Sequence, residues 1–274
     1  MSTLIQISDP HFGTEQPQVV AALLTFVRRV QPIVAVLSGD ITQRARSEQF
    51  AAAKRFVDQL GVPHCLVIPG NHDIPLLNVV ARAFFPYAGF QRVFGAVLEP
   101  HLQSDAFRLI CLNTTRPSRH KDGEISDEQI ERVVRQLCEA NRSQLRIVVT
   151  HQPVHVLRDS EVHNRVHGYE RAVKAWADAG ADIIMGGHIH LPYVASLNEH
   201  FPDLSRRCWA VQAGTAVSHR VRARHPNSVN LIHFSAGSQN CSVERWDYDA
   251  ASAGFRRVDT RELLLERSNP APPQ

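Results

Sequence analysis

Residues 64–73 read His-Cys-Leu-Val-Ile-Pro-Gly-Asn-His-Asp, an apolar run that ends in a glycine, an amide, an imidazole and a carboxylate. The segment His64–Ile68 has the length and the apolar character of a buried strand, and Pro69-Gly70 ends it. No common turn type requires the continuation Asn71-His72-Asp73. These three polar side chains at a strand end therefore indicate chemistry rather than a simple turn.

Four further predicted strands end in the same way. The polar segments that follow them are Ser8-Asp9-Pro10-His11 after residues 4–7, Gly39-Asp40 after 33–37, Thr150-His151 after 145–149, and Gly186-Gly187-His188-Ile189-His190 after 182–185. In open α/β sheets, ligands bind at the carboxyl edge of the strands. The sequence therefore predicts that all five segments gather at one edge.

Helical and strand-like segments alternate through the first two thirds of the chain. Apolar side chains recur at helical spacing over residues 18–30 and 47–60, and a capping box of Ser126 with Gln129 begins a later helix. After Pro192 the pattern consists of strands alone, over residues 209–212, 229–234, 243–246 and 255–258. This order predicts an α/β protein in which helices lie outside layered sheets.

The chain has 274 residues, and a prior of about one domain per 150 residues allows one or two domains. No internal repeat is visible, and we expect a single domain over residues 1–267. Within it, residues 74–105 mix prolines and glycines with apolar patches and are predicted to form a cap-like helical and loop excursion. The tail, residues 268–274 (Ser-Asn-Pro-Ala-Pro-Pro-Gln), is predicted to be disordered.

The polar groups at the strand ends form a set of potential metal ligands. They are Asp9, His11, Asp40, Asn71, His151, His188 and His190. Carboxylate and amide oxygens with imidazole nitrogens, and no thiolate, suit borderline divalent ions such as Mn²⁺, Fe²⁺, Co²⁺, Ni²⁺ or Zn²⁺. Seven ligands are too many for one ion and fit two, provided that one carboxylate bridges them. Each motif alone has an ordinary explanation, such as a Gly-Asp turn, but all five in this order favour a two-metal site.

The ordered motifs resemble those of the calcineurin-like metallophosphoesterase family over residues 4–190. Chain length and the segment Gly214-Thr215-Ala216 resemble bacterial class III cyclic nucleotide phosphodiesterases and their diesterase relatives. The resemblance implies a four-layer αββα sandwich of two mixed sheets flanked by helices. Two departures from the family pattern are Pro10 and Gln152, the latter standing where many relatives have a second histidine.

The resemblance also implies a role for each motif residue. The first metal ion would be held by Asp9, His11 and His190, the second by Asn71, His151 and His188, with Asp40 bridging the two. His72 would face the phosphate as a catalytic group, with Asp73 behind it and holding its other nitrogen. Two divalent ions are expected as cofactors, drawn from Mn²⁺, Fe²⁺/Fe³⁺, Zn²⁺ and Co²⁺.

The function implied is that of a metal-dependent phosphoric diester hydrolase, in which a metal-bridging hydroxide attacks the phosphorus. The expected substrate is a small-molecule phosphodiester, with 3′,5′-cyclic AMP as the first choice. An alternative is hydrolysis of glycerophosphodiesters, phospholipids or nucleotide-sugar pyrophosphates, and an apolar cap over residues 76–97 would favour a lipid. A non-catalytic metal-binding scaffold is a third possibility, which the intact His72 and ligand set disfavour.

Composition indicates which partners and which cellular compartment to expect. Lys and Arg total 30 against 27 Asp and Glu, and because no basic run stands out, nucleic acid is not the default partner. No apolar stretch reaches the ~18 residues of a membrane span. Five cysteines without a CxxC pair, and no export signal, predict reduced core thiols in a cytoplasmic protein. Trp176 and Trp209 are predicted core residues, and a homodimer remains open.

Further histidines and cations outside the motifs are candidates for the rim of the cleft. They are His155, His163 and His167, the cluster His219, Arg220, Arg222 and Arg224, and the loop residues Arg116, Arg119, His120 and Lys121. Solvated loops or exposed strands with extended arginines are equally ordinary explanations. The sequence leaves open whether Arg220, Arg222 or His155 lines the cleft.

Overall fold

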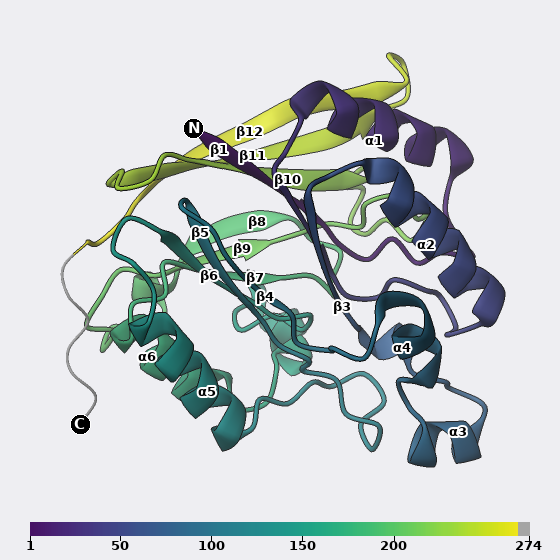
Figure 1. The fold of residues 1–274 in the computed structure, drawn as a ribbon, viewed down its shortest axis with the longest axis horizontal. Coiled ribbons are helices and arrows are strands. Elements are labelled where there is room, and N and C mark those ends of the chain that lie inside the picture. Colours follow the sequence, from purple (N-terminus) through teal and green to yellow (C-terminus); the bar gives the residue numbers. More distant parts are fainter. Residues whose placement is uncertain (268–274) are drawn as a thin grey trace.

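The computed structural model describes residues 1–267, which form two mixed six-stranded sheets (Figure 1). The first sheet has the order β12(Gly254–Leu264), β11(Asn240–Asp249), β10(Ser228–Phe234), β1(Ser2–Ile7), β2(Val34–Ser38) and β3(His64–Ile68). The second has the order β4(His101–Gln103), β5(Phe107–Cys111), β6(Leu145–Val149), β7(Ile183–Gly186), β9(Trp209–Gln212) and β8(Tyr193–Ser196).

Helices cover the outer face of each sheet. The helices are α1(Pro17–Val30), α2(Ser47–Leu60), α3(Val79–Phe84), α4(Ala88–Phe94), α5(Asp127–Cys138) and α6(Tyr169–Asp178), with short 3-10 turns η1(Asn71–Asp73), η2(Asp159–Asn164) and η3(Leu197–Glu199). Figure 1 shows α1 and α2 on one side of the stacked sheets and α5 and α6 on the other. The predicted four-layer αββα sandwich is confirmed.

Three apolar layers hold this sandwich together. Val19, Leu23 and Phe26 of α1 pack with residues of α2 against the first sheet. The two sheets bury a second layer between them, and α5 and α6 bury a third, in which Trp176 is fully enclosed. Because both faces of the central strands are covered, β2, β5 and β6 are buried along their whole length.

The parallel strands of each sheet fix where the polar motifs lie. In the first sheet β1, β2 and β3 run parallel, and in the second β5, β6, β7 and β9 do. The carboxyl ends of each set therefore meet at one edge of their sheet.

Most predicted elements match the structure within two residues. The capping box on α5 is confirmed, since the Ser126 hydroxyl accepts from the Gln129 amide and the Gln129 side chain accepts from the Ser126 amide. Two short strands, β4 and β8, were not predicted. Since β4 pairs with β5, the predicted excursion over 74–105 is wrong at its C-terminal end, which belongs to the second sheet.

Two core assignments need correction. Each of the five cysteines is a free thiol, but Cys138 is exposed at the end of α5 and Cys65 is only half-buried. Trp209 is also half-buried, and its indole N–H donates to the carbonyl of Leu264 at 3.1 Å. The predicted disordered tail, 268–274, lies outside the described residues. Among residues 1–267, the helices are too short or too polar to cross a membrane.

Candidate metal centre

The structure gathers the seven predicted ligands at the carboxyl edges of the two sheets. Asp9, Asp40 and Asn71 follow β1, β2 and β3 of the first sheet, while His151 and His188 follow β6 and β7 of the second. Within residues 1–267, every cluster of three or more potential ligand side chains lies at this edge. The clusters are Asp9–His11–His190, His11–Asp40–His72 and Asp40–His151–His188.

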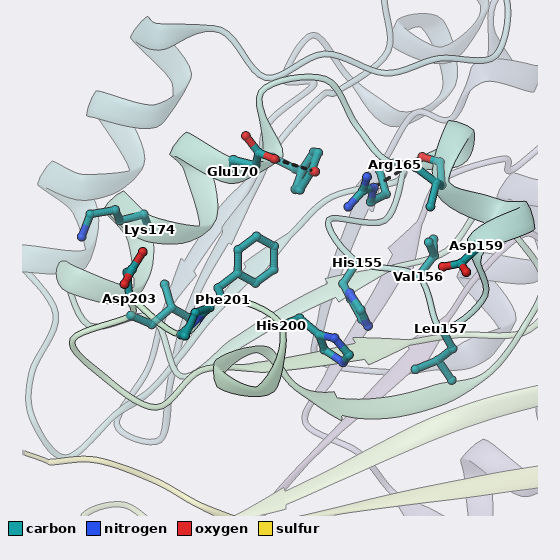
Figure 2. Close-up of a pocket in the computed structure, with 14 residues that line it drawn as sticks. His155, Val156, Leu157, Asp159, Arg165, Glu170, Lys174, His200, Phe201 and Asp203 are labelled. Carbon is teal, nitrogen blue, oxygen red and sulfur yellow. Dashed lines mark hydrogen bonds between the residues drawn. The ribbon is translucent and has the colours of Figure 1, made fainter.

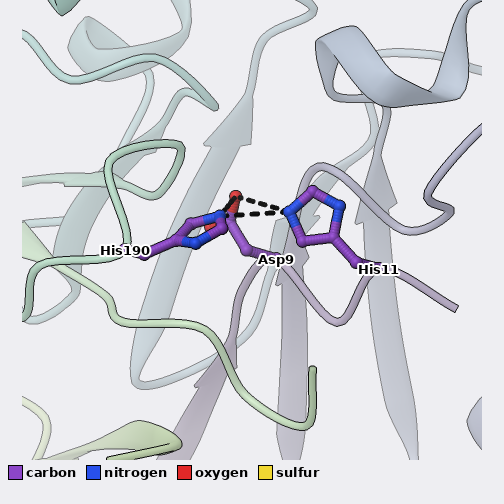
Figure 3. Close-up of side chains that lie close together, drawn as sticks. All are labelled: Asp9, His11 and His190. Carbon is purple, nitrogen blue, oxygen red and sulfur yellow. Dashed lines mark hydrogen bonds and ion pairs between the residues drawn. The ribbon is translucent and has the colours of Figure 1, made fainter. Parts of the chain in front are cut away.

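The first group consists of Asp9, His11 and His190, which converge in Figure 3. His190 Nε2 lies 3.3 Å from Asp9 Oδ1, and His11 Nε2 lies 3.0 Å from His190 Nε2. Asp9 and His11 are fully buried, and His190 is nearly so. Three donor atoms that point at a common position, out of contact with water, are the arrangement that a metal ion requires.

The second group consists of Asp40, His151 and His188, with Asn71 beside them. His151 Nε2 lies 3.3 Å from Asp40 Oδ1 and 3.2 Å from Asn71 Oδ1. Asn71 is therefore placed to add a neutral oxygen to this group.

Asp40 stands between the two groups. Its Oδ2 lies 3.6 Å from His11 Nε2 of the first group, while its Oδ1 faces His151 of the second. One carboxylate thus presents an oxygen to each group, as a bridging ligand must.

Backbone contacts orient two of the rings. The Nδ1 atoms of His151 and His190 lie 2.9 and 2.7 Å from the carbonyl oxygens of Ser38 and Arg220. Since a carbonyl only accepts, each Nδ1 carries the hydrogen and each Nε2 faces the group. His11 Nδ1 and His188 Nδ1 are buried without a hydrogen-bond partner. Oxygen and imidazole donors with orphaned ring nitrogens fit borderline divalent ions.

The local backbone is strained at the same positions. Five of the seven predicted ligands have left-handed φ angles: Asp9 at 51°, His11 at 46°, Asp40 at 49°, His188 at 69° and His190 at 56°. Non-glycine residues adopt this region rarely and at a cost, and such residues cluster at functional sites.

Two glycines allow the chain segments to approach. A β-carbon on Gly187 would lie 2.0 Å from Ser8 Oγ and 2.5 Å from Asp9 Oδ2. A β-carbon on Gly70 would lie 2.2 Å from Asp40 Oδ1. Side chains at either position would displace a carboxylate of the cluster, so these glycines make room for the ligands.

Electrostatics prepare the groups for a cation. Burial disfavours ionised carboxyl groups, but the neighbouring histidines outweigh it, lowering the pKa of Asp9 to about 2 and that of Asp40 well below its usual range. Burial lowers the pKa of His11 and of His188 to about 3. Burial also opposes a proton on His151, but Asp40 raises the pKa of this ring to about 9. The ionised carboxylates and the neutral rings of His11 and His188 are in the protonation states that bind metal, whereas His151 would release a proton to an arriving ion.

His72 lies beside the cluster, and its anchoring differs from the expectation. Its Nδ1 lies 2.9 Å from the carbonyl oxygen of Gln43 and not against Asp73. Asp73 instead accepts from the backbone amides of Ile41, Thr42 and Gly70 at 2.7–3.0 Å. The expectation that Asp73 holds the His72 ring is therefore wrong. Asp73 ties the loop after β2 to the turn after β3, which makes it a positioning residue.

An open cleft of about 390 Å³ leads to the cluster. Arg220 and Arg222 both line it, together with Lys121 and Asn164. The Arg220 guanidinium lies 3.2 Å from His72 Nε2, and Arg222 pairs with the buried Glu161 at 2.6 Å. Gln43, Asn164 and Glu161 were missed by the sequence analysis, because they lie outside the motifs and no spacing marks them.

His155 lies in a different cavity, of about 550 Å³, between η2, α6 and the segment after η3 (Figure 2). Its ring stacks on His200 with 3.9 Å between ring centroids. His167 pairs with Asp122 at the exposed surface. Neither residue lines the cleft described above.

The unusual Gln152 does not touch the ligands. Its Oε1 accepts from the Thr114 hydroxyl, and its Nε2 donates to the carbonyl of Lys121 at 3.1 Å. Gln152 therefore holds the loop that carries Lys121 to the cleft.

Comparisons with known proteins agree with this geometry. A family model described as calcineurin-like phosphoesterase matches residues 2–192. The chain is 24% identical over 185 residues to a probable cyclic nucleotide phosphodiesterase from Synechococcus, covering 64% of each chain. It is 24% identical over 200 residues to a probable glycerophosphodiester phosphodiesterase from Arcobacter nitrofigilis, covering 68% of this chain and 71% of the relative.

Solved structures show the same fold at low identity. A purple acid phosphatase from yellow lupin superposes with a TM-score of 0.70 at 12% identity, over 96% of this chain and 53% of that one. A dimetal phosphatase from Danio rerio superposes with a TM-score of 0.66 at 12% identity, over 97% of this chain and 99% of that one. The chain therefore spans about half of the lupin protein and nearly all of the fish protein.

Proposed function

Because this chain belongs to the calcineurin-like phosphoesterase family, we propose that it is a phosphodiesterase whose two divalent ions are held by the seven residues at the sheet edge. The family resemblance expected from the motifs is thereby confirmed. The family depends on two metal ions, and the chain supplies two candidate groups for them.

The position of Asp40 carries the proposal. Its two carboxylate oxygens face different histidine groups, at 3.6 Å from His11 Nε2 and 3.3 Å from His151 Nε2. A single-ion site has no use for this arrangement, whereas a shared anion offsets the repulsion between two nearby cations. In the proposed assignment, Asp9, His11 and His190 hold one ion, Asn71, His151 and His188 hold the other, and Asp40 bridges.

The chain's own side chains then bind and orient the phosphodiester. Two ions bound at these groups would activate a water and offset charge on the phosphate oxygens. Among the cations of the cleft, Arg222 is paired with Glu161, while Arg220 extends to the ring of His72. Arg220 and Lys121 are thus the cations placed to bind the substrate's phosphate.

His72 is the candidate proton donor to the leaving alkoxide. Its Nδ1 donates to the Gln43 carbonyl, which directs Nε2 into the cleft beside Arg220. A donor role requires a second proton on Nε2, next to the Arg220 cation. An arriving phosphate would attract the Arg220 guanidinium to its own oxygens and leave His72 Nε2 facing the leaving group.

A cyclic nucleotide is the first-choice substrate class. The Synechococcus relative carries that activity in its name, and the cleft of about 390 Å³ has the size of small-ligand sites. The Arcobacter relative, at equal identity and greater coverage, favours glycerophosphodiesters as the second candidate.

The deciding experiment is a substrate panel with Mn²⁺ added. It compares 3′,5′-cyclic AMP, glycerophosphodiesters, a nucleotide-sugar pyrophosphate and a phosphomonoester, with the Asp40→Ala variant as the inactive control. We expect the wild type to hydrolyse a diester and the Asp40→Ala variant not to do so. Bound metal without turnover of any substrate would favour the scaffold alternative and overturn the proposal.

A further inference from the structure

The helix α3 carries an apolar face that points into solvent. Its exposed apolar side chains are Val79, Val80 and Phe84, with Leu77 just before the helix and Phe85 just after it, and none of the residues 79–84 is buried. We call these five side chains the outer face of α3. Leu77 is 90% exposed, Phe84 73% and Phe85 66%. Figure 1 shows α3 at the periphery, away from both sheets. Surface helices normally turn their apolar side inward, so the outer face of α3 needs a partner.

The polar side of α3 is fixed to the protein by Arg82. Its guanidinium donates to the carbonyls of Pro75, Pro117 and Arg119, at 2.7–3.2 Å. The neighbouring helix α4 is anchored differently, since Phe90 is buried against Phe50 of α2. The bonds of Arg82 thus fix the polar side of α3 to the protein, so that its apolar side faces outward.

The surroundings of this face are basic. Residues 74–98 contain two arginines and no aspartate or glutamate. The loop 116–121, to which Arg82 binds, adds His120 and Lys121, as well as Arg119, which is paired with Glu124 at 2.8 Å. His120 and Lys121 are exposed, and the Lys121 ammonium makes no ion pair within residues 1–267. A partner of this surface must accept apolar side chains in its middle and provide negative charge at its edge.

We propose that the outer face of α3, with the basic loop 116–121, docks on an anionic lipid membrane surface. A bilayer interface takes up leucine, valine and phenylalanine side chains to a shallow depth, while its anionic headgroups attract nearby lysine and arginine. A second copy of this chain fits less well, because two-fold pairing of α3 would bring Lys121 of each copy, which is unpaired within residues 1–267, toward the same interface. This inference is independent of the proposed catalytic activity.

Docking in this way places the cleft near the lipid headgroups. Ile74 and Leu76, just before α3, line a cavity of about 170 Å³ together with His72 and Lys121. The metal edge and the docking face therefore share one side of the molecule, joined by the loop 116–121.

Cosedimentation with vesicles tests the proposal without any activity assay. The wild type is expected to sediment with vesicles of phosphatidylcholine and phosphatidylglycerol, weakly with phosphatidylcholine alone, and to be released by salt. The double variant Leu77→Ser/Phe84→Ser should bind these vesicles at least about tenfold more weakly. Loss of apolar side chains that are buried in the bilayer interface has effects of this size. Thermal unfolding of each variant verifies that it is folded.

The matched control is Val258→Ser/Leu264→Ser, which removes two half-exposed apolar side chains from β12. Its vesicle binding should equal that of the wild type. Absence of wild-type binding, or equal loss in the control, would overturn the proposal. A third outcome would assign the face to a second copy of the chain instead. In that case the wild type does not bind vesicles, and light scattering shows a dimer that Leu77→Ser/Phe84→Ser converts to a monomer.

Discussion

Two clusters of histidines differ in what surrounds them. At the sheet edge, His11, His151, His188 and His190 alternate with the carboxylates of Asp9 and Asp40 on left-handed backbone. In the larger cavity beside η2, His155 stacks on His200, and within residues 1–267 no carboxylate joins them in a cluster of ligands. Cavity size alone would favour the second region, at about 550 Å³ against about 390 Å³, yet the donor set for metal ions lies in the first.

The difference shows that carboxylates decide the chemistry of a histidine cluster. At the sheet edge, carboxylates and histidines stabilise each other's charged forms: the pKa of Asp9 is about 2 and that of His151 is about 9. Burial, reinforced by His200 and Arg165, lowers the pKa of His155 to about 4, so that this ring is neutral and packs against its neighbours. Substitutions at the sheet edge should therefore change metal content or turnover, whereas a substitution of His155 should change only the pH dependence of stability.

The largest effect is expected from Asp40→Ala. Removal of the shared anion leaves two cations close together without their common ligand, so turnover should fall below detection and both metals should be lost. Elemental analysis and a diesterase assay measure this. If the variant kept two metals per chain and near-normal turnover, Asp40 would not be the bridging ligand. The two regions would then not differ in the role of their carboxylates.

His72→Ala should reduce kcat while leaving the metal content intact. General acid catalysis contributes roughly 10²–10⁴-fold, and a loss in this range is expected for diesters with alkoxide leaving groups. With p-nitrophenolate, which leaves readily without a proton, the loss should shrink. Equal losses on both substrates would show that His72 binds the phosphate and does not donate a proton.

Asn71→Ala should affect one half of the cluster only. A neutral amide oxygen is a weak ligand, so the affinity for the second ion should fall on the order of 10–100-fold, the range seen for groups that support metal ligands. The first ion, held by Asp9, His11 and His190, should remain. Metal titration followed by elemental analysis distinguishes the sites, and selective loss of the first ion would contradict the assignment.

The smallest effect on activity is expected from His155→Gln, which should leave metal content and turnover unchanged. Its effect should appear in the pH dependence of stability. Because the pKa of His155 is about 4 in the folded protein against 6.5 for a free imidazole, the unfolded chain takes up the proton first. Stability is thus lost as the pH falls from 6.5 toward 4. Thermal unfolding across this range should show a shallower decline for the variant, and an unchanged slope would count against this environment.

Much of the site was predictable because its residues lie in short motifs directly after strands. Parallel pairing of β1 with β2, and of β2 with β3, then brings Asp9, Asp40 and Asn71 together with no further information. The capping box at Ser126 was likewise a local signal.

Contacts between distant segments were not predictable. The sequence placed Asp73 behind His72, but the Gln43 carbonyl takes that position, and backbone carbonyls leave no trace in a sequence. Arg220 and Arg222 reach the cleft from a loop far along the chain, where the sequence left their position open. The short strands β4 and β8 were missed because they lie at the edges of the second sheet, where their partly exposed side chains form no buried apolar run.

The pairing of β1 with β10 has a consequence for how the chain folds. Ile5 is opposite Leu231 in the register, and the Thr215 hydroxyl donates to the carbonyl of Asp9 at 2.6 Å. The first ligand loop therefore obtains its support from a segment synthesised more than two hundred residues later. Until that segment leaves the ribosome, β1 is an unpaired edge, and such long-range pairing is slow and exposed to misassociation. The proposed metal site is thus completed only late in the biosynthesis of the chain.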